Sequence, residues 1–253
     1  MREQVALVTG GSRGIGAATV RLLAESGARV AFTNRTRKAD ADAVLHALTR
    51  RSGSGVTVRA YQSTLATSEA NDQLVADVVR DFGGLDVFVA NAGVWVPDHV
   101  RLTEMSDTQW RETLRANLDA VFFGCRAALR EVRPGGSIVI VGSTAGQRGE
   151  AFHADYAATK GAVIAFTKSL PVEAAPAVRV NCVAPGWVDT EMCAQPYGAD
   201  GGAGRTRIEA GIPLGRVAAP EDIAGPIVFL CSPLARHITG EIVNVNGGAV
   251  LCG

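Results

Sequence analysis

The sequence predicts an α/β protein in which a seven-stranded parallel sheet carries helices on both faces. Short runs rich in valine and isoleucine alternate with longer segments of helical periodicity along the chain. This alternation favours a parallel sheet, because parallel strands need a crossover connection, which is usually a helix. With 253 residues, of which 47% are hydrophobic, the chain can build one large core, and no linker or repeat divides it. We therefore expect a single domain over residues 1–253.

The expected strands are the short runs richest in β-branched residues. They are Val5–Val8, Arg29–Thr33, Val56–Tyr61, Asp86–Ala90, Ser137–Val141, Val178–Val183 and Glu241–Val245. The expected helices occupy the longer segments, namely Ile15–Ser26, Lys38–Arg51, Glu69–Phe82, Asp107–Val132, Ala154–Ala174 and Pro220–Cys231. The glycine-rich stretch Gln195–Arg205 is predicted to be a loop that does not pack. We interpret residues 191–215 as a mobile substrate lid, with an ordinary surface loop as the alternative.

Charge and cysteine content exclude several classes of protein. The 25 basic residues balance the 25 acidic ones, so no broad positive field is present to attract nucleic acid or an anionic membrane. No stretch approaches the ~20 uninterrupted apolar residues of a transmembrane helix, and the N-terminal segment is too short and mixed for a signal peptide. The five cysteines lack C-x-x-C spacing, which argues against a disulfide framework or a zinc site. We expect a cytoplasmic protein without metal, nucleic-acid or membrane partners.

A glycine-rich turn follows the first strand and leads directly into a helical pattern. Residues 9–16 read Thr-Gly-Gly-Ser-Arg-Gly-Ile-Gly. Gly10 permits the sharp turn, Gly14 lets the backbone approach a pyrophosphate, and Gly16 lets the helix pack closely against the strand. The expected cofactor contacts here are Gly10, Ser12, Arg13, Gly14, Ile15 and Gly16. This position in an alternating α/β chain predicts a nucleotide-binding Rossmann fold, with an ordinary strand-to-helix turn as the alternative.

The end of the second strand indicates which dinucleotide is bound. An acidic residue there accepts a hydrogen bond from the ribose 2′-OH of NAD, whereas the 2′-phosphate of NADP needs cations. This strand ends in Asn34 and Arg35, followed by Arg37 and Lys38, and the glycine-rich turn adds Arg13. No acid is present, so NADPH is favoured over NADH. The alternative is that the three basic residues after Asn34 are a solvated helix start.

Four polar residues form a candidate catalytic set. Tyr156 and Lys160 are four residues apart on a predicted helix and share one face. Ser143 lies just beyond the fifth strand, at the edge where open α/β sheets bind ligands. Asn117 falls on the apolar stripe of the helix Asp107–Val132, where the alternative is a satisfied buried polar residue. We expect Tyr156 to donate a proton, Lys160 to lower its pKa, Ser143 to hold a carbonyl oxygen and Asn117 to fix a water near Lys160.

The turn at residues 9–16 and this set of Asn, Ser, Tyr and Lys resemble the short-chain dehydrogenase/reductase family. The segments 212–216, 238–240 and 245–248 look especially like 3-oxoacyl-(acyl-carrier-protein) reductases and related ketoreductases. The resemblance implies further cofactor contacts at Asn91, Ala92, Gly93, Pro185, Gly186, Val188 and Thr190. Thr64, beside Leu65, stands where the family usually places Asp, and its hydroxyl is expected to accept a hydrogen from adenine. The family also implies a homotetramer.

One departure from the family pattern concerns the carrier protein. Carrier-protein-dependent reductases tend to place an Arg where this chain has Val172, which weakens the case for a carrier protein as an obligatory partner. The loops facing the substrate supply Trp95, Phe152, Trp187 and Met192 around Ser143, and such residues suit an apolar, cyclic or aromatic ketone. His153, just before the catalytic helix, is interpreted as a surface or capping residue.

The function that these observations predict is NADPH-dependent reduction of a ketone to a secondary alcohol. The ketone is a 3-oxoacyl thioester or a polyketide or secondary-metabolite carbonyl, and Tyr156 is the proton donor. One alternative is an NAD(P)-linked alcohol dehydrogenase that oxidises a sugar, steroid or other metabolite. A more distant one is a non-catalytic dinucleotide-binding regulator, which would be expected to have lost part of the catalytic set.

Overall fold

The computed structural model describes residues 1–52 and 57–251. Its sheet has seven parallel strands in the order β3-β2-β1-β4-β5-β6-β7, which confirms the predicted fold class. The strands are β1 Val5–Val8, β2 Arg29–Asn34, β3 Val58–Gln62, β4 Leu85–Ala90, β5 Val132–Val141, β6 Arg179–Pro185 and β7 Ile242–Val245. The expected start of the third strand at Val56 lies outside the described residues.

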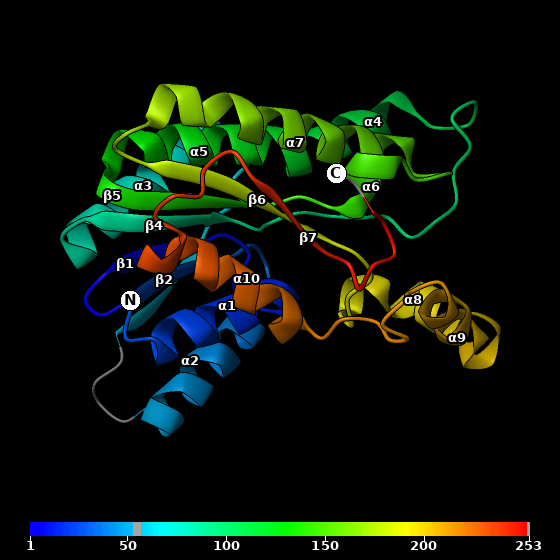
Figure 1. Cartoon of the computed structure of the whole chain (residues 1–253), viewed down its shortest axis with the longest axis horizontal. Helices are drawn as coiled ribbons and strands as arrows, with labels where there is room; N and C mark the ends of the chain where they lie inside the picture. The colour runs from blue at the N-terminus through cyan, green and yellow to red at the C-terminus, as the bar shows by residue number, and fades with distance from the viewer. Residues whose placement is uncertain (53–56, 252–253) are drawn as a thin grey trace.

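Helices cover both faces of this sheet (Figure 1). One face carries α1 (Gly14–Glu25), α2 (Lys38–Ser52) and α10 (Pro220–Cys231); the other carries α3 (Ser68–Phe82), α5 (Ala120–Glu131) and α7 (Ala154–Ala174). Successive strand residues point to opposite faces, so Val8 packs with the first set of helices and Leu7 with the second. The sheet is therefore buried on both sides, as its valine-rich strands predict.

The segment predicted as one helix, Asp107–Val132, is three elements instead. It consists of α4 (Asp107–Leu114), a π-helical turn at Arg115–Asp119, and α5, after which Val132 already belongs to β5. A π-turn inserts one extra residue and rotates the side chains that follow it relative to those before it. Asn117 lies within this turn and is completely buried, with 0% exposure.

The prediction that Gln195–Arg205 forms a loop is also wrong for the backbone. This segment is occupied by α8 Ala194–Gly198, η4 Ala199–Gly202 and the start of α9 Ala203–Ala210, and η3 Glu191–Cys193 precedes it. Tyr197 anchors them, since it is buried and its hydroxyl donates to the Val188 carbonyl at 2.9 Å. In Figure 1, α8 and α9 lie beyond the sheet, apart from both helical layers. Of the other helices, α6 (Thr144–Arg148) connects β5 to α7, and the short η5 (Pro233–Ala235) follows α10.

Two features are absent from the described residues. Within residues 1–52 and 57–251, no helix combines the length and apolar character needed to cross a membrane. Over the same residues, no group of three or more His, Cys, Asp or Glu side chains is arranged to hold a metal ion.

Candidate active site

The glycine-rich turn between β1 and α1 is shaped for close approach of an anion. Gly10 and Gly14 have φ of 66° and 52°, in the left-handed region that favours glycine. A Cβ on Gly16 would lie 2.1 Å from the Gly10 carbonyl oxygen, so only glycine fits there. The first turn of α1 contains no acidic residue, and the Arg13 side chain does not cap the helix. The N-terminus of α1, which includes Ile15 and follows the half-buried Ser12, is thus open to a phosphate.

Two side chains outside the glycine motif hold this turn in place. The Asn91 amide donates to the carbonyls of Thr9 and Gly10 at 2.9 and 3.2 Å. The Thr9 hydroxyl accepts from the backbone N–H groups of Asn91 and Ala92, both at 3.0 Å. On the other side, the Thr33 hydroxyl accepts from the Gly10 N–H at 2.9 Å. The sequence predicts a role for Asn91 and Ala92; Thr9 and Thr33 were not among the predicted residues.

The end of β2 places the predicted basic residues near the turn, and two of them share an acidic partner. Asn34 is buried and Arg35 is exposed. Arg13 is joined to Arg37 rather than to Arg35, because both donate to Oε2 of Glu191, at 2.7 and 2.8 Å. Glu191 lies far away in the sequence, and no local pattern indicates this contact.

The predicted adenine contact lies just beyond β3. Thr64 is exposed, whereas Leu65 is buried and has a φ of 55°. The Leu65 carbonyl accepts a hydrogen bond from the Asn71 amide at 3.1 Å. On the other side of Thr64, the Ser63 N–H donates to the Asn34 carbonyl at 3.0 Å. These two bonds hold Thr64 at the end of the sheet, close to the end of β2.

Ser143, Tyr156 and Lys160 come together beyond the end of β5. Lys160 Nζ donates to the Val141 carbonyl at 2.8 Å and lies 5.7 Å from the ring centre of Tyr156. Burial lowers the pKa of Lys160 to about 8. Burial also raises the pKa of Tyr156, and a hydrogen bond with Ser143 opposes that rise. Burial is thus the larger effect on the pKa of Tyr156, and the lowering of this pKa by Lys160 stays a prediction.

Asn117 lies beneath this group and is tied to the segment after β4. Its carbonyl oxygen accepts from the Val94 N–H at 2.7 Å, and its amide donates to the Val94 carbonyl at 2.8 Å. A Cβ on Gly93 would lie 3.0 Å from Asn117 Oδ1 and 3.8 Å from Lys160 Nζ. Gly93 therefore keeps Asn117 and Lys160 close together, while a water between them stays a prediction.

Asp155 is a buried acid that the sequence analysis did not identify. Its Oδ2 accepts from the Thr113 hydroxyl at 2.8 Å and the Gln109 amide at 3.1 Å, and its Oδ1 accepts from the Tyr156 N–H at 2.9 Å. These bonds fasten the start of α7 to α4 and so position the helix that carries Tyr156 and Lys160. An acid in the first turn of a helix is the one local signal of this role.

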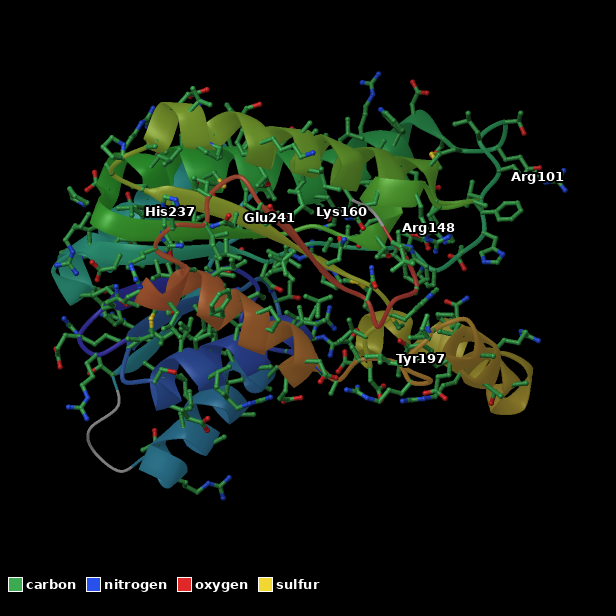
Figure 2. All side chains as sticks on the ribbon, in the orientation of Figure 1. Arg101, Arg148, Lys160, Tyr197, His237 and Glu241 are labelled. Atoms are coloured by element: carbon green, nitrogen blue, oxygen red, sulfur yellow. The ribbon has the colours of Figure 1, made fainter. Side chains whose placement is uncertain are left out.

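Aromatic rings line the region between this group and α8. Trp95 lies edge-on to Trp187 at 6.1 Å and is stacked on His153 at 4.8 Å. Phe152 is 46% exposed and lies at the rim, and Met192 is also exposed, in η3. His153 is 5% exposed, so its interpretation as a surface residue is wrong, and its side chain makes no helix-capping bond. Figure 2 shows the same end of the molecule, where Lys160 and Arg148 lie near each other and Tyr197 lies below them.

Glu150 adds a negative charge to this region. The Trp95 indole hydrogen-bonds to it, and His153 Nδ1 lies 3.9 Å from its Oε1. Burial raises the pKa of Glu150, and its charge in turn raises the pKa of Tyr156.

The segment after β6 closes the site from the other side. Pro185 ends β6, and a Cβ on Gly186 would lie 2.9 Å from Cβ of Asn246. Val188 is buried. A methyl group of Thr190 lies 3.1 Å from where a Cβ on Gly14 would be. The start of the 191–215 segment thus lies over the glycine-rich turn.

Residues 10–250 match a protein-family model described as Enoyl-(Acyl carrier protein) reductase. The chain is 40% identical over 251 residues to a 3-oxoacyl-[acyl-carrier-protein] reductase of Vibrio cholerae, with 98% of each chain covered. It is 38% identical to an uncharacterized oxidoreductase of Methylorubrum extorquens, again with 98% of each covered. A short-chain dehydrogenase/reductase structure from Brucella melitensis superposes with a TM-score of 0.92 at 34% identity, covering 100% of this chain and 98% of that one.

The chain belongs to the short-chain dehydrogenase/reductase family. It is accordingly an NAD(P)-dependent oxidoreductase similar to 3-oxoacyl-(acyl-carrier-protein) reductases. Another short-chain dehydrogenase structure, from Burkholderia cenocepacia and in complex with NADP, has a TM-score of 0.88 and 34% identity, with 98% of each chain covered.

Proposed function

We propose that this short-chain dehydrogenase/reductase reduces a ketone to a secondary alcohol with NADPH. The observation that carries the proposal is the meeting of Ser143, Tyr156 and Lys160 beyond β5, on the side of the sheet where the glycine-rich turn ends β1. Ligands of open α/β sheets bind at this edge.

The residues around the turn fit a phosphorylated dinucleotide. The left-handed Gly10 and Gly14 and the open N-terminus of α1 suit its pyrophosphate. Arg13, Arg35 and Arg37 suit a 2′-phosphate, which requires cations. The NADP complex of the Burkholderia cenocepacia protein supports this choice of cofactor. When bound, NADPH supplies the hydride.

The remaining contacts proposed for the cofactor surround this turn. They are Ser12, Ile15 and Gly16 in the turn, Asn34 after β2, Thr64 and Leu65 after β3, Asn91, Ala92 and Gly93 after β4, Tyr156 and Lys160 on α7, and Pro185, Gly186, Val188 and Thr190 after β6.

The chain's own residues supply the proton and hold the carbonyl. Burial keeps the proton on Tyr156 at neutral pH, so the phenol is available as an acid toward the developing alkoxide. Ser143 hydrogen-bonds with the same phenol and is placed to donate to the carbonyl oxygen. Lys160 provides a nearby positive charge that stabilises the phenolate left after proton transfer, because it lies one helical turn along α7.

The proposed substrate is an apolar ketone with a cyclic or aromatic part. Trp95 and Trp187 form an aromatic wall beside the catalytic group, and Phe152 and Met192 lie exposed at the rim. A 3-oxoacyl thioester is the other substrate class, supported by the similarity to 3-oxoacyl-[acyl-carrier-protein] reductases. Val172, where such reductases tend to have Arg, is 87% exposed, which argues against a carrier protein as obligatory partner.

We also propose a homotetramer and a mobile lid. Trp110 of α4 and Phe122 of α5 are 37% and 41% exposed, and apolar side chains of this size on neighbouring helices suit a subunit interface. Residues 191–215 are the proposed lid, because they lie beyond the sheet and start above the glycine-rich turn. The cytoplasmic location stays a prediction.

The test is the loss of reduced-nicotinamide absorbance with purified protein, run with NADPH and with NADH. A β-ketoacyl thioester is compared with a panel of cyclic and aromatic ketones. Turnover of any of these with NADPH supports the proposal, and the reacting class identifies the substrate. Activity only as alcohol oxidation with NAD would favour a dehydrogenase of opposite direction, and no turnover with any cofactor would favour a binding protein.

Tyr156→Phe tests the proton donor. We expect kcat to fall at least ~100-fold with NADPH binding retained, because the variant lacks only the acidic hydroxyl. Tyr61→Phe is the matched control, since its hydroxyl bonds to Asp81 on the distant β3–α3 side. Near-normal turnover of Tyr156→Phe would rule out this assignment.

A further inference from the structure

Two arginines of the proposed phosphate site share one carboxylate oxygen. Arg13 belongs to the glycine-rich turn, Arg37 to the segment between β2 and α2, and both donate to Oε2 of Glu191, at 2.7 and 2.8 Å. Glu191 follows Thr190 and is the first residue of η3. One acidic side chain thus connects three segments that are far apart in the sequence.

The charges around this contact are exposed and mostly positive. The side chains of Arg13, Arg37 and Glu191 are 50%, 52% and 57% exposed. Asp40 makes a longer contact with Arg37, at 3.4 Å. Arg35 and Lys38 are also exposed nearby. Glu191 therefore places its charge where the arginines would otherwise face only water and one more distant acid.

A carboxylate and a phosphate oxygen use the same donors of a guanidinium group. In the absence of an anionic ligand, Glu191 relieves the repulsion between Arg13 and Arg37. A 2′-phosphate that reaches the same donors must first displace this carboxylate or share the arginines with it. A ribose with a free 2′-OH does not need these donors and encounters no such competition.

We propose that Glu191 is a specificity-determining residue that competes with the 2′-phosphate of NADPH for Arg13 and Arg37. It thereby reduces the preference for NADPH over NADH that the arginines create. The inference rests on the proposed function only for the identity of the cofactor. Because Glu191 also begins the 191–215 segment, its displacement by phosphate removes two ion pairs between that segment and the cofactor site.

The first experiment measures binding without turnover. Full-length wild-type protein and Glu191→Gln are titrated by calorimetry with 2′,5′-ADP and with 5′-AMP, which differ only by the 2′-phosphate. Two exposed ion pairs correspond to roughly two- to tenfold in an equilibrium constant. We therefore expect Glu191→Gln to bind 2′,5′-ADP about two- to tenfold more tightly and 5′-AMP with unchanged affinity, with the gain shrinking at high salt.

The matched control is Glu221→Gln. Glu221 is also exposed and bonds at 2.7 Å to an arginine of α1, Arg21, but takes no part in the contact with Arg13. This variant should bind both nucleotides like the wild type. An equal gain for Glu221→Gln would overturn the proposal, since the effect would then be one of net charge.

A second variant pair tests whether the arginines mediate the effect. In an Arg13→Gln, Arg37→Gln background, adding Glu191→Gln should no longer improve binding of 2′,5′-ADP. Unchanged or weaker binding of 2′,5′-ADP by the single variant Glu191→Gln would overturn the proposal. Weaker binding would mean that Glu191 positions the arginines for the phosphate. Failure of the ketone assay with NADPH would not affect these titrations, so the two proposals fail independently.

Discussion

The titration of Lys160 should make the free energy of unfolding of the protein depend on pH. This side chain is 4% exposed, and burial lowers its pKa from the ordinary 10.5 to about 8. At ~1.4 kcal/mol per pKa unit, this difference corresponds to about 3 kcal/mol. Because the folded pKa lies below the unfolded one, the unfolded chain binds this proton more strongly. The destabilisation is therefore complete below about pH 8 and is relieved as the pH rises from about 8 through 10.5.

The perturbation is Lys160→Met, which keeps the length of the side chain and removes the titrating group. Free energies of unfolding are measured in urea at pH 7 and at pH 10.5, at one fixed protein concentration because the proposed assembly would add to the stability. The variant also loses the bond to the Val141 carbonyl, at 2.8 Å, so its stability at a single pH mixes two effects. The change with pH of the difference between the two proteins reports the titration of Lys160, together with its coupling to Cys182, whose pKa the charge of Lys160 lowers.

We expect the wild type to gain about 3 kcal/mol relative to Lys160→Met between these two pH values. A difference that stays constant with pH would refute the reasoning, because it would mean that Lys160 titrates alike in the folded and unfolded chains.

Three further substitutions test the cofactor site and its support. Gly16→Ala places a Cβ 2.1 Å from the Gly10 carbonyl oxygen and should weaken NADPH binding about tenfold in a fluorescence titration. The control Gly225→Ala, whose Cβ would have nothing within 4 Å, should leave NADPH binding unchanged. Equal effects of the two substitutions would contradict the steric argument. Asp155→Ala leaves three donors without their acceptor and should lower the free energy of unfolding in urea by about 3 kcal/mol; a loss below ~1 kcal/mol would show that water replaces the carboxylate. Arg35→Asp should shift the ratio of kcat/KM values toward NADH, and an unchanged ratio would count against Arg35 as a phosphate ligand.

The sheet could be predicted because each strand carries its own signal. Val5–Val8 has the same bounds in the sequence prediction and in the structure, since a run of four apolar residues before a glycine-rich turn needs no distant partner to be recognised. Tyr156 and Lys160 were identifiable for a similar reason, because their spacing on one helix is local information. The helix Ala154–Ala174 was predicted with its observed bounds, although it contains Pro171.

The features that were missed depend on contacts between distant segments. The π-turn around Asn117 interrupts a pattern that reads as one helix, and the bonds of Asn117 go to Val94, 23 residues earlier. Tyr197 anchors α8 through the carbonyl of Val188, which composition alone does not indicate in a glycine-rich stretch. The pairing of Glu191 with Arg13 and Arg37 spans more than 150 residues of sequence and follows only from the fold.

The hydrogen bonds that Asn91, Thr9 and Thr33 make to the glycine-rich turn have a kinetic consequence. They are formed within the protein itself, so the turn has its binding shape before any dinucleotide arrives. A loop that must be ordered on binding costs conformational entropy, which weakens affinity and slows productive encounter. We therefore expect the pyrophosphate of the dinucleotide to meet a turn that is already ordered, and we expect the motion on binding to lie in Glu191 and the proposed lid, residues 191–215.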